Sequence, residues 1–180
     1  MKVEDAYYYK NLIMIGFFDD YDTWLNGHLE TEEPLSDIIL ELSCSQSDIN
    51  KTVSVLHNYC NGKTFDEIEL CNRIRLFFKN AYNLNKMSKE QITKHMYRIS
   101  LNIAESCDFE LNTTLWRSMF YLYDYYSLAK QGIISWNNFD VAFFSYLNNG
   151  IPLNDEIIWK SSNLKKPSLI KRIKNLFIKK

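Results

Sequence analysis

The stretch NTTLWRSMFYLYDYYSLAKQGIISWNNFDVAFFSYLNNG, residues 112–150, decides the fold. Apolar residues recur in its first half at the spacing that gives a helix one apolar face, namely Leu115, Met119, Leu122, Tyr126 and Ala129. Gly132 then stands where a left-handed cap ends a helix, and Ser135 opens a second apolar run as its N-cap. Because so short a connection makes two helices fold back on each other, the stretch predicts an antiparallel helical hairpin.

Similar signals predict further helices ahead of this hairpin. A first helix is expected over residues 4–18, and the residues expected to start the next ones are Asp19 or Asp20, Pro34, Ser47, Thr64 and Ser88. The segments 64–67 and 88–91 are capping boxes, in which two side chains satisfy free backbone amides reciprocally. The apolar faces of the fourth and fifth helices are expected to begin with Ile49 and Ile68.

Composition favours the same fold class. The chain has 180 residues, of which 46% are hydrophobic, and only 5 Gly and 3 Pro interrupt it. Few such interruptions favour long helices over many short strands, and a chain of this length buries about 70% of its unfolded surface. The sequence therefore predicts an all-α domain over residues 1–160, with eight to ten helices in antiparallel hairpins. Their arrangement is either an irregular bundle or a helical-repeat-like stack.

The C-terminal end has a different character. Residues 154–159 are expected to form a short helix, and residues 161–180 a linker and a basic amphipathic helix. In SLIKRIKNLFIKK, residues 168–180, lysines face away from one apolar side made by Leu169, Ile173, Leu176 and Phe177. Such a helix can dock on the core, lie on an anionic membrane surface, or contact RNA or an acidic neighbour.

Charge is distributed unevenly along the chain, although the net charge is only −1. Residues 1–41 hold ten acids and two lysines, a balance of −8, whereas residues 159–180 hold eight bases and no acid, a balance of +8. Such an asymmetry informs on partners and not on the fold. A dense acidic group is either a solvated face or a docking surface for a basic protein, and it disfavours nucleic acid by repulsion.

No pattern in the sequence identifies a reaction. The three histidines, His28, His57 and His95, are far apart, and the four cysteines, at 44, 60, 71 and 107, have neither disulfide nor zinc-site spacing. The run DDYD at residues 19–22 lacks the glycine and the glutamate of a calcium loop. We therefore expect no enzyme, no metal and no cofactor. An enzyme would need His95 to converge with a distant carboxylate or cysteine.

The N-terminal residues give an expectation about location. Acids and tyrosines interrupt MKVEDAYYYKNLIMIGFF, residues 1–18, where a signal peptide has an apolar core. No run approaches the roughly 18 apolar residues of a membrane span. A cytoplasmic protein is expected.

Seven residues are the candidate contacts for a partner. They are six acids of the N-terminal region and the tryptophan among them: Asp19, Asp20, Asp22, Trp24, Glu30, Glu32 and Glu33. A second candidate is the tyrosine run at positions 121, 123, 125 and 126. An unbroken run must cover most of a helix circumference, so these rings are either core and rim or a protein-binding patch.

These features resemble immunity proteins of bacterial contact-dependent growth-inhibition systems. The segments EEPLSDIILELSCSQSDINKTVSVLHNYC, residues 32–60, and SWNNFDVAFFSYLNNGIPL, residues 135–153, have the character of that class. The resemblance implies a protein that neutralises a cognate toxin, often a nuclease, by binding over or beside its active site. The hypothesis is therefore an inhibitor whose acidic residues occlude a basic toxin domain, without direct nucleic-acid binding.

A second hypothesis concerns the C-terminal helix. The protein would then be a helical scaffold or regulatory protein, and residues 168–180 would bind a membrane or a partner protein. The two hypotheses differ in which charged segment makes the contact.

Overall fold

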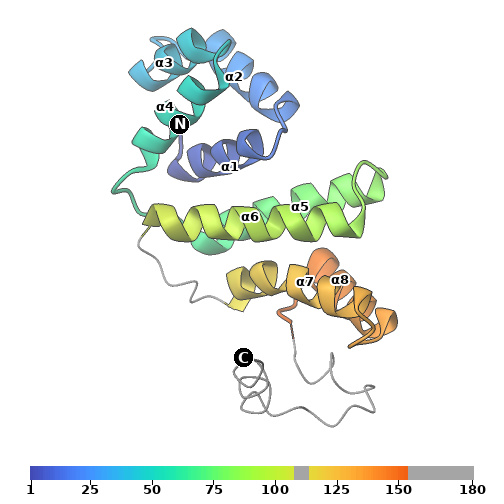
Figure 1. Cartoon of the computed structure of the whole chain (residues 1–180). Helices are drawn as coiled ribbons and strands as arrows, with labels where there is room; N and C mark the ends of the chain where they lie inside the picture. The colour runs from blue at the N-terminus through green and yellow to red at the C-terminus, as the bar shows by residue number, and fades with distance from the viewer. Residues whose placement is uncertain (108–113, 154–180) are drawn as a thin grey trace, which may run out of the picture.

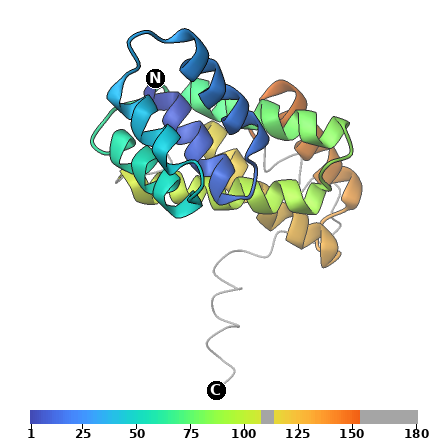
Figure 2. The same cartoon turned by 90° about the horizontal axis from the view of Figure 1, so that it is seen from above.

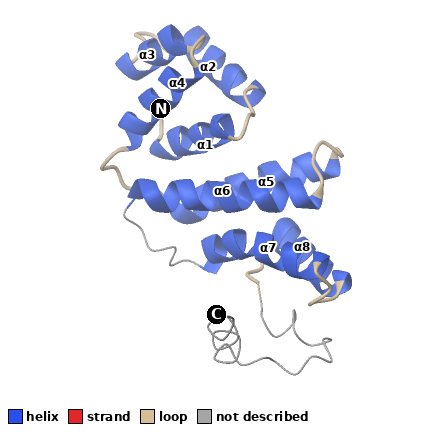
Figure 3. Ribbon diagram, in the orientation of Figure 1, coloured by secondary structure: helices blue, strands red, loops and turns tan. Residues whose placement is uncertain are grey.

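The computed structural model describes residues 1–107 and 114–153, and every regular element in that part is a helix (Figures 1 and 3). The helices are α1 (Val3–Met14), α2 (Asp19–Thr31), α3 (Asp37–Ser45), α4 (Ile49–Cys60), α5 (Glu67–Asn83), α6 (Lys89–Cys107), α7 (Thr114–Lys130) and α8 (Trp136–Asn149). The all-α prediction is confirmed. The short helix, the linker and the basic helix expected over residues 154–180 lie outside the described residues.

The helices lie in three tiers, formed by α1–α4, by α5 with α6, and by α7 with α8 (Figure 1). α1 packs on α4 within its tier and on α5 and α6 of the next, while α7 and α8 both contact α5. Figure 2 shows the same stack from above, with α1–α4 in front of the α5–α6 pair. Buried apolar side chains from all three tiers form one core cluster. No helix in the described ranges has the length and apolar character needed to cross a bilayer.

α1 is the helix around which the first two tiers are built. All of its residues from 6 to 13 are buried, among them Tyr7, Lys10 and Asn11. Two of its polar groups find partners within the helix, because Asn11 Nδ2 donates to the Tyr7 carbonyl at 2.8 Å and the Lys10 ammonium lies over the Tyr7 ring. A helix that is buried all round needs neighbours on every side, and α1 has them in α4, α5 and α6.

The hairpin predicted from residues 112–150 forms as α7 and α8, but it is the end tier of the stack and not its centre. The reason is visible in the tyrosine run, since Tyr121 on the outer side of α7 is 46% exposed. Tyr123, Tyr125 and Tyr126 are half-buried. The exposed side of α7 has no further helix packed on it in the described part of the chain, whereas α1 is covered on every side.

Several helix boundaries follow the predicted local chemistry. At the start of α6 the Ser88 N–H donates to Gln91 Oε1 at 2.9 Å, and the Gln91 N–H donates to Ser88 Oγ at 3.3 Å. At the start of α8 the Asn138 N–H donates to Ser135 Oγ at 3.1 Å. Gly132 follows α7 with φ +70°. The capping box at residues 88–91, the Ser135 cap and the Gly132 cap are confirmed.

The capping box predicted to start with Thr64 is wrong. The N-cap of α5 is Asp66, whose Oδ1 accepts the N–H groups of Ile68 and Glu69, each at 2.9 Å. The N–H of Asp66 itself donates to Glu4 Oε1 of α1 at 2.8 Å. A contact between two helices therefore fixes where α5 begins, and a local pattern cannot report it.

Two more starts are displaced. The N-cap of α4 is Asp48, not Ser47, and it accepts the Lys51 N–H at 3.1 Å. Pro34 lies outside α3, whose N-cap is Ser36. In both cases the helix begins after the first residue that could have started it.

The apolar faces expected from Ile49 and Ile68 also begin too early. The two side chains are 52% and 58% exposed. Each belongs to the first turn of its helix, at the edge of the packed region. The buried face starts three residues later in α4, at Thr52, and two residues later in α5, at Leu70.

The end of α8 is held by a side chain from α5. Arg75 is 9% exposed, and its Nη1 donates to the carbonyl of Leu147 at 2.8 Å. The last carbonyls of a helix have no partner within the helix, so this bond supplies one. Gly150 follows in a left-handed conformation with φ +65°, and a Cβ added to it would lie 3.3 Å from Arg75 Nε.

Because of this contact, two glycines with similar backbone conformations should differ in how much an alanine substitution destabilises the fold. Gly132 and Gly150 both have left-handed φ values, but only Gly150 faces a side chain. We expect G132A to lower the free energy of unfolding by about 1 kcal/mol through backbone strain, and G150A to lower it by about 2 kcal/mol because Arg75 must also shift. Urea unfolding of the two variants and the wild type measures the difference. Equal losses would contradict the role given to Arg75.

Candidate partner-binding site

An open groove of about 610 Å³ lies between the α1–α2 connection and the C-terminal half of α5. It forms because α1 ends above α5 and the chain turns back at once, with the Phe17 N–H donating to the Leu12 carbonyl at 2.9 Å. The ring of Phe17 then meets that of Phe77 on α5, with 5.2 Å between the centroids. The two tiers are thereby joined at the floor of the groove.

The groove has an apolar lining that is open to solvent. Phe17, Phe18 and Phe77 are half-buried in it. Leu76 of α5 and Leu84, the residue that follows the last turn of α5, lie along it and are 45% and 65% exposed. Exposed leucines beside half-buried aromatic rings are typical of a surface that buries an apolar side chain of a partner.

Acids stand at one side of the groove and bases at other points of its rim. Asp19 and Asp20, the first two residues of α2, are exposed and line it. Arg73 also lines it, but its Nη1 donates to Asp5 Oδ1 of α1 at 2.6 Å and its guanidinium lies 4.3 Å from the centroid of the Tyr8 ring. The charge of Arg73 is therefore matched inside the protein, whereas the two aspartates face solvent.

Tyr8 forms part of the groove wall and stays neutral. Burial raises the pKa of Tyr8 to about 12, and the nearby negative charge of Asp20 adds to the effect. A hydroxyl with so high a pKa offers a hydrogen-bond donor to a ligand at every physiological pH. Lys86 lies in the same lining, in the connection after α5.

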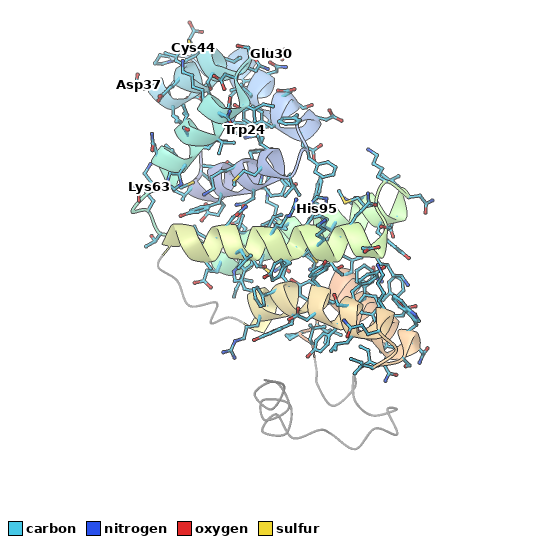
Figure 4. The ribbon with its side chains drawn as sticks, viewed as in Figure 1. Trp24, Glu30, Asp37, Cys44, Lys63 and His95 are labelled. Carbon is cyan, nitrogen blue, oxygen red and sulfur yellow. The ribbon has the colours of Figure 1, made fainter. Side chains whose placement is uncertain are left out.

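The seven candidate residues do not form one patch. Asp19 and Asp20 lie at the groove, while Asp22 turns to the α3–α4 connection, where its Oδ1 accepts Gln46 Nε2 at 3.3 Å. Glu30 follows Asp19 by eleven residues of helix, which is about 16 Å along the axis. Figure 4 places Glu30 at the outer end of the first tier, far from His95 on α6.

Two of the candidates make their contacts within the protein. Trp24 packs against the rings of Tyr9 and His28, with centroid distances of 4.8 and 4.7 Å. Glu32 accepts the Ser36 N–H at 3.0 Å and contacts His28 Nδ1, also at 3.0 Å. The bond from Ser36 and the contact with His28 lower the pKa of Glu32. Glu30 and Glu33 remain exposed at that end of α2.

The apolar half of the groove was missed in the sequence analysis. Leu76 and Leu84 lie off the apolar stripe of α5, whose buried members are Leu70, Ile74 and Phe78. A large apolar residue outside the stripe of a helix is the signal that could have pointed to them. Nothing in the sequence links them to Asp19, because more than fifty residues separate the two segments.

Possible metal ligands and cysteines are the other chemically reactive groups among the described side chains. Among residues 1–104 and 115–153, no three His, Cys, Asp or Glu side chains gather as metal ligands would. Cys44 is exposed, whereas Cys60 and Cys71 are buried. Burial raises the pKa of Cys71 to about 11, and its Sγ lies 3.5 Å from the Tyr146 hydroxyl. A thiol with that pKa is not a nucleophile at neutral pH.

His95 belongs to the packing beneath the groove. Its ring meets Phe17 edge-on at 6.1 Å and stacks with Phe78 at 6.5 Å. Burial lowers the pKa of His95, and the charges of Arg98 and Lys94 lower it further. The ring therefore supports Phe17 as a neutral group.

Comparison of the chain with family models, with curated proteins and with solved structures gives no match. Any statement about function therefore depends on the groove, on the charges around it and on the resemblance seen in the sequence.

The lowered pKa of His95 makes stability fall in acid. The unfolded chain takes up a proton near pH 6.5 and the folded state only at a lower pH, so this contribution is complete above pH 6.5 and is lost as the pH falls through the folded pKa. We expect H95F to lose less unfolding free energy than the wild type between about pH 7.5 and 5, as measured by urea unfolding. H57F, at an exposed position on α4, is the control. The same pH dependence in H95F and H57F would contradict this assignment.

Proposed function

We propose that this protein is a non-enzymatic binding protein that holds a basic partner protein at the groove and at the acidic start of α2. Within that class, we propose an immunity protein that neutralises a cognate toxin domain, most simply a nuclease. The groove, the acids and the resemblance each support a different part of this proposal.

The observation that carries the proposal is the pairing of two surfaces in one groove. Exposed apolar side chains, Leu76 and Leu84, lie in the same lining as the exposed carboxylates Asp19 and Asp20. An apolar centre with a charged rim is the usual anatomy of a protein interface. The sign of the unpaired charge favours a partner that presents lysine or arginine.

A basic partner with an acidic inhibitor suits a nuclease. A nuclease must present cationic groups to phosphates, and carboxylates placed over those groups occupy them in the same way. The exposed Glu30 and Glu33 at the other end of α2 extend the negative field and speed the encounter. The same field repels nucleic acid, so the toxin and not its substrate is the expected ligand.

The direct experiment is native co-purification of the tagged full chain from its own host, with captured proteins identified by mass. A basic toxin domain held in a one-to-one complex, and inactive in it, supports the proposal. A captured partner that is acidic, or a basic partner whose activity is unchanged in the complex, overturns the inhibitor assignment.

Neutralising the groove acids tests where the partner binds. We expect D19N/D20N to slow association about tenfold in low salt and much less in high salt, since steering by exposed charge is screened. E30Q/E33Q removes the same charge from the far end of α2 and should slow association less. Association rates at two ionic strengths, from surface-based or stopped-flow binding, measure both. Equal slowing by the two variants would mean that the partner is attracted by the overall negative charge of the region and does not bind specifically at the groove.

The apolar half of the groove has its own test. Because Leu84 is 65% exposed, L84D should leave folding intact and weaken the complex mainly through faster dissociation. The control is I68D, since Ile68 is 58% exposed in the first turn of α5 but does not line the groove. Weakening by I68D as large as that by L84D would place the interface elsewhere on α5.

A further inference from the structure

One chain carries both a groove with two exposed carboxylates at one side and a basic amphipathic segment. The groove offers Asp19 and Asp20 beside Leu76 and Leu84. Residues 168–180 contain five bases and no acid, together with apolar residues at helical spacing. We infer that residues 168–180 dock in this groove and occupy it until a basic partner displaces them. The displacement rests on the proposed function, whereas the docking does not.

The exit of the chain from the helical stack lies close to the groove. Gly150 lies against Arg75 and Asn72 of α5, and the Leu153 N–H donates to Ser118 Oγ of α7 at 2.9 Å. Arg73 lines the groove two residues from Arg75, which is about 200° around the same helix. Gly150 therefore lies on the face of α5 opposite the groove, at the same level along the helix, and the described chain ends three residues later against α7.

The length of the connection is sufficient. Fourteen residues, 154–167, separate Leu153 from Ser168. With the first six in the short helix expected from the sequence and the other eight extended, they span about 35 Å. The path from Leu153, against α7, to the groove crosses the second tier, whose helices are each about 10 Å in diameter, so this span covers it. A tether of this kind holds a segment near its site at a local concentration in the millimolar range. Even a weak intrinsic affinity is then enough for the groove to be filled.

The chemistry of the two surfaces matches. Leu169, Ile173, Leu176 and Phe177 fall on one side of a helical projection of the segment, and an apolar side of that kind suits the lining of Leu76, Phe77 and Leu84. Arg172, Lys174 and Lys179 lie at the two edges of that side in the same projection, and the two lysines can reach carboxylates at the rim. Arg73 adds little repulsion because Asp5 already pairs with it.

Zero-length carbodiimide crosslinking of the full chain tests the docking. This reagent joins a carboxylate to a lysine only when the two are in contact. We expect monomeric protein to yield crosslinks from Asp19 or Asp20 to Lys174 or Lys179, and none from Glu30 or Glu33 to either lysine. The yield should fall with added salt. Tail lysines joined only to acids outside the groove, crosslinks only between two chains, or no crosslinks of the tail would each overturn the inference.

Two variants separate a docked segment from chance encounters of charge. I173D places a charge on the apolar side of the segment and should lower the crosslink yield about tenfold, because the lost burial of one isoleucine outweighs the tether. I178D is the matched control, since Ile178 projects to the opposite side of the same helical pattern. Equal yields in I173D and the wild type would contradict docking through that side.

The same variants distinguish this inference from the proposed function. If the segment fills the groove in about nine molecules of ten, I173D should tighten the partner dissociation constant about tenfold, and I178D should not change it. Partner binding that both variants leave unchanged would overturn the displacement. Crosslinks without any basic partner would refute the proposed function and leave the docking intact, and a bound partner without crosslinks would refute the docking alone.

Discussion

The burial of α1 on all sides is the constraint on which the structure depends. Eight successive residues of this helix, 6–13, are buried, so it must be enclosed by α4 on one side and by α5 and α6 on the other. Two polar contacts set its position against α5, the Asp5–Arg73 ion pair and the bond from the Asp66 N–H to Glu4. Since α1 can end only above α5, the turn that follows it delivers Phe17, Phe18 and the first residues of α2 to the C-terminal half of α5. The groove is a consequence of where α1 ends.

Much of the fold could be predicted because its signals are local. The Ser88 and Ser135 caps depend on residues within one turn of the helix that they begin, and such chemistry is legible in sequence. The prediction at Thr64 was wrong because a residue of α1, Glu4, binds the backbone at Asp66. The central place of α1 was not predicted for a similar reason. Its three successive tyrosines suggest a helix with one solvent-exposed face. All three are buried only because other helices pack around α1.

The candidate site was predicted in part. The sequence correctly shows the acids as a dense group along the chain. In the structure they are separated by the length of α2, with three in its first turn and three at or just after its C-terminal end. The structure also shows that Glu32 is engaged by Ser36 and His28, and that Trp24 is stacked between aromatic neighbours. The leucines of α5 could not be linked to Asp19 in advance, because the pairing of distant segments is decided by tertiary contacts. The acidic residues could be identified from the sequence, whereas the apolar groove next to Asp19 and Asp20 could not.

The bond from Arg75 to the carbonyl of Leu147 has a consequence for how the molecule opens. A helix end that finds its hydrogen-bond partner on another helix cannot be complete while the two are apart. The last turn of α8 and the middle of α5 should therefore protect their amide hydrogens as one cooperative unit, although some seventy residues separate them in sequence. During synthesis α5 exists before α8, so the end of α8 is finished only by docking, and the third tier closes the fold last.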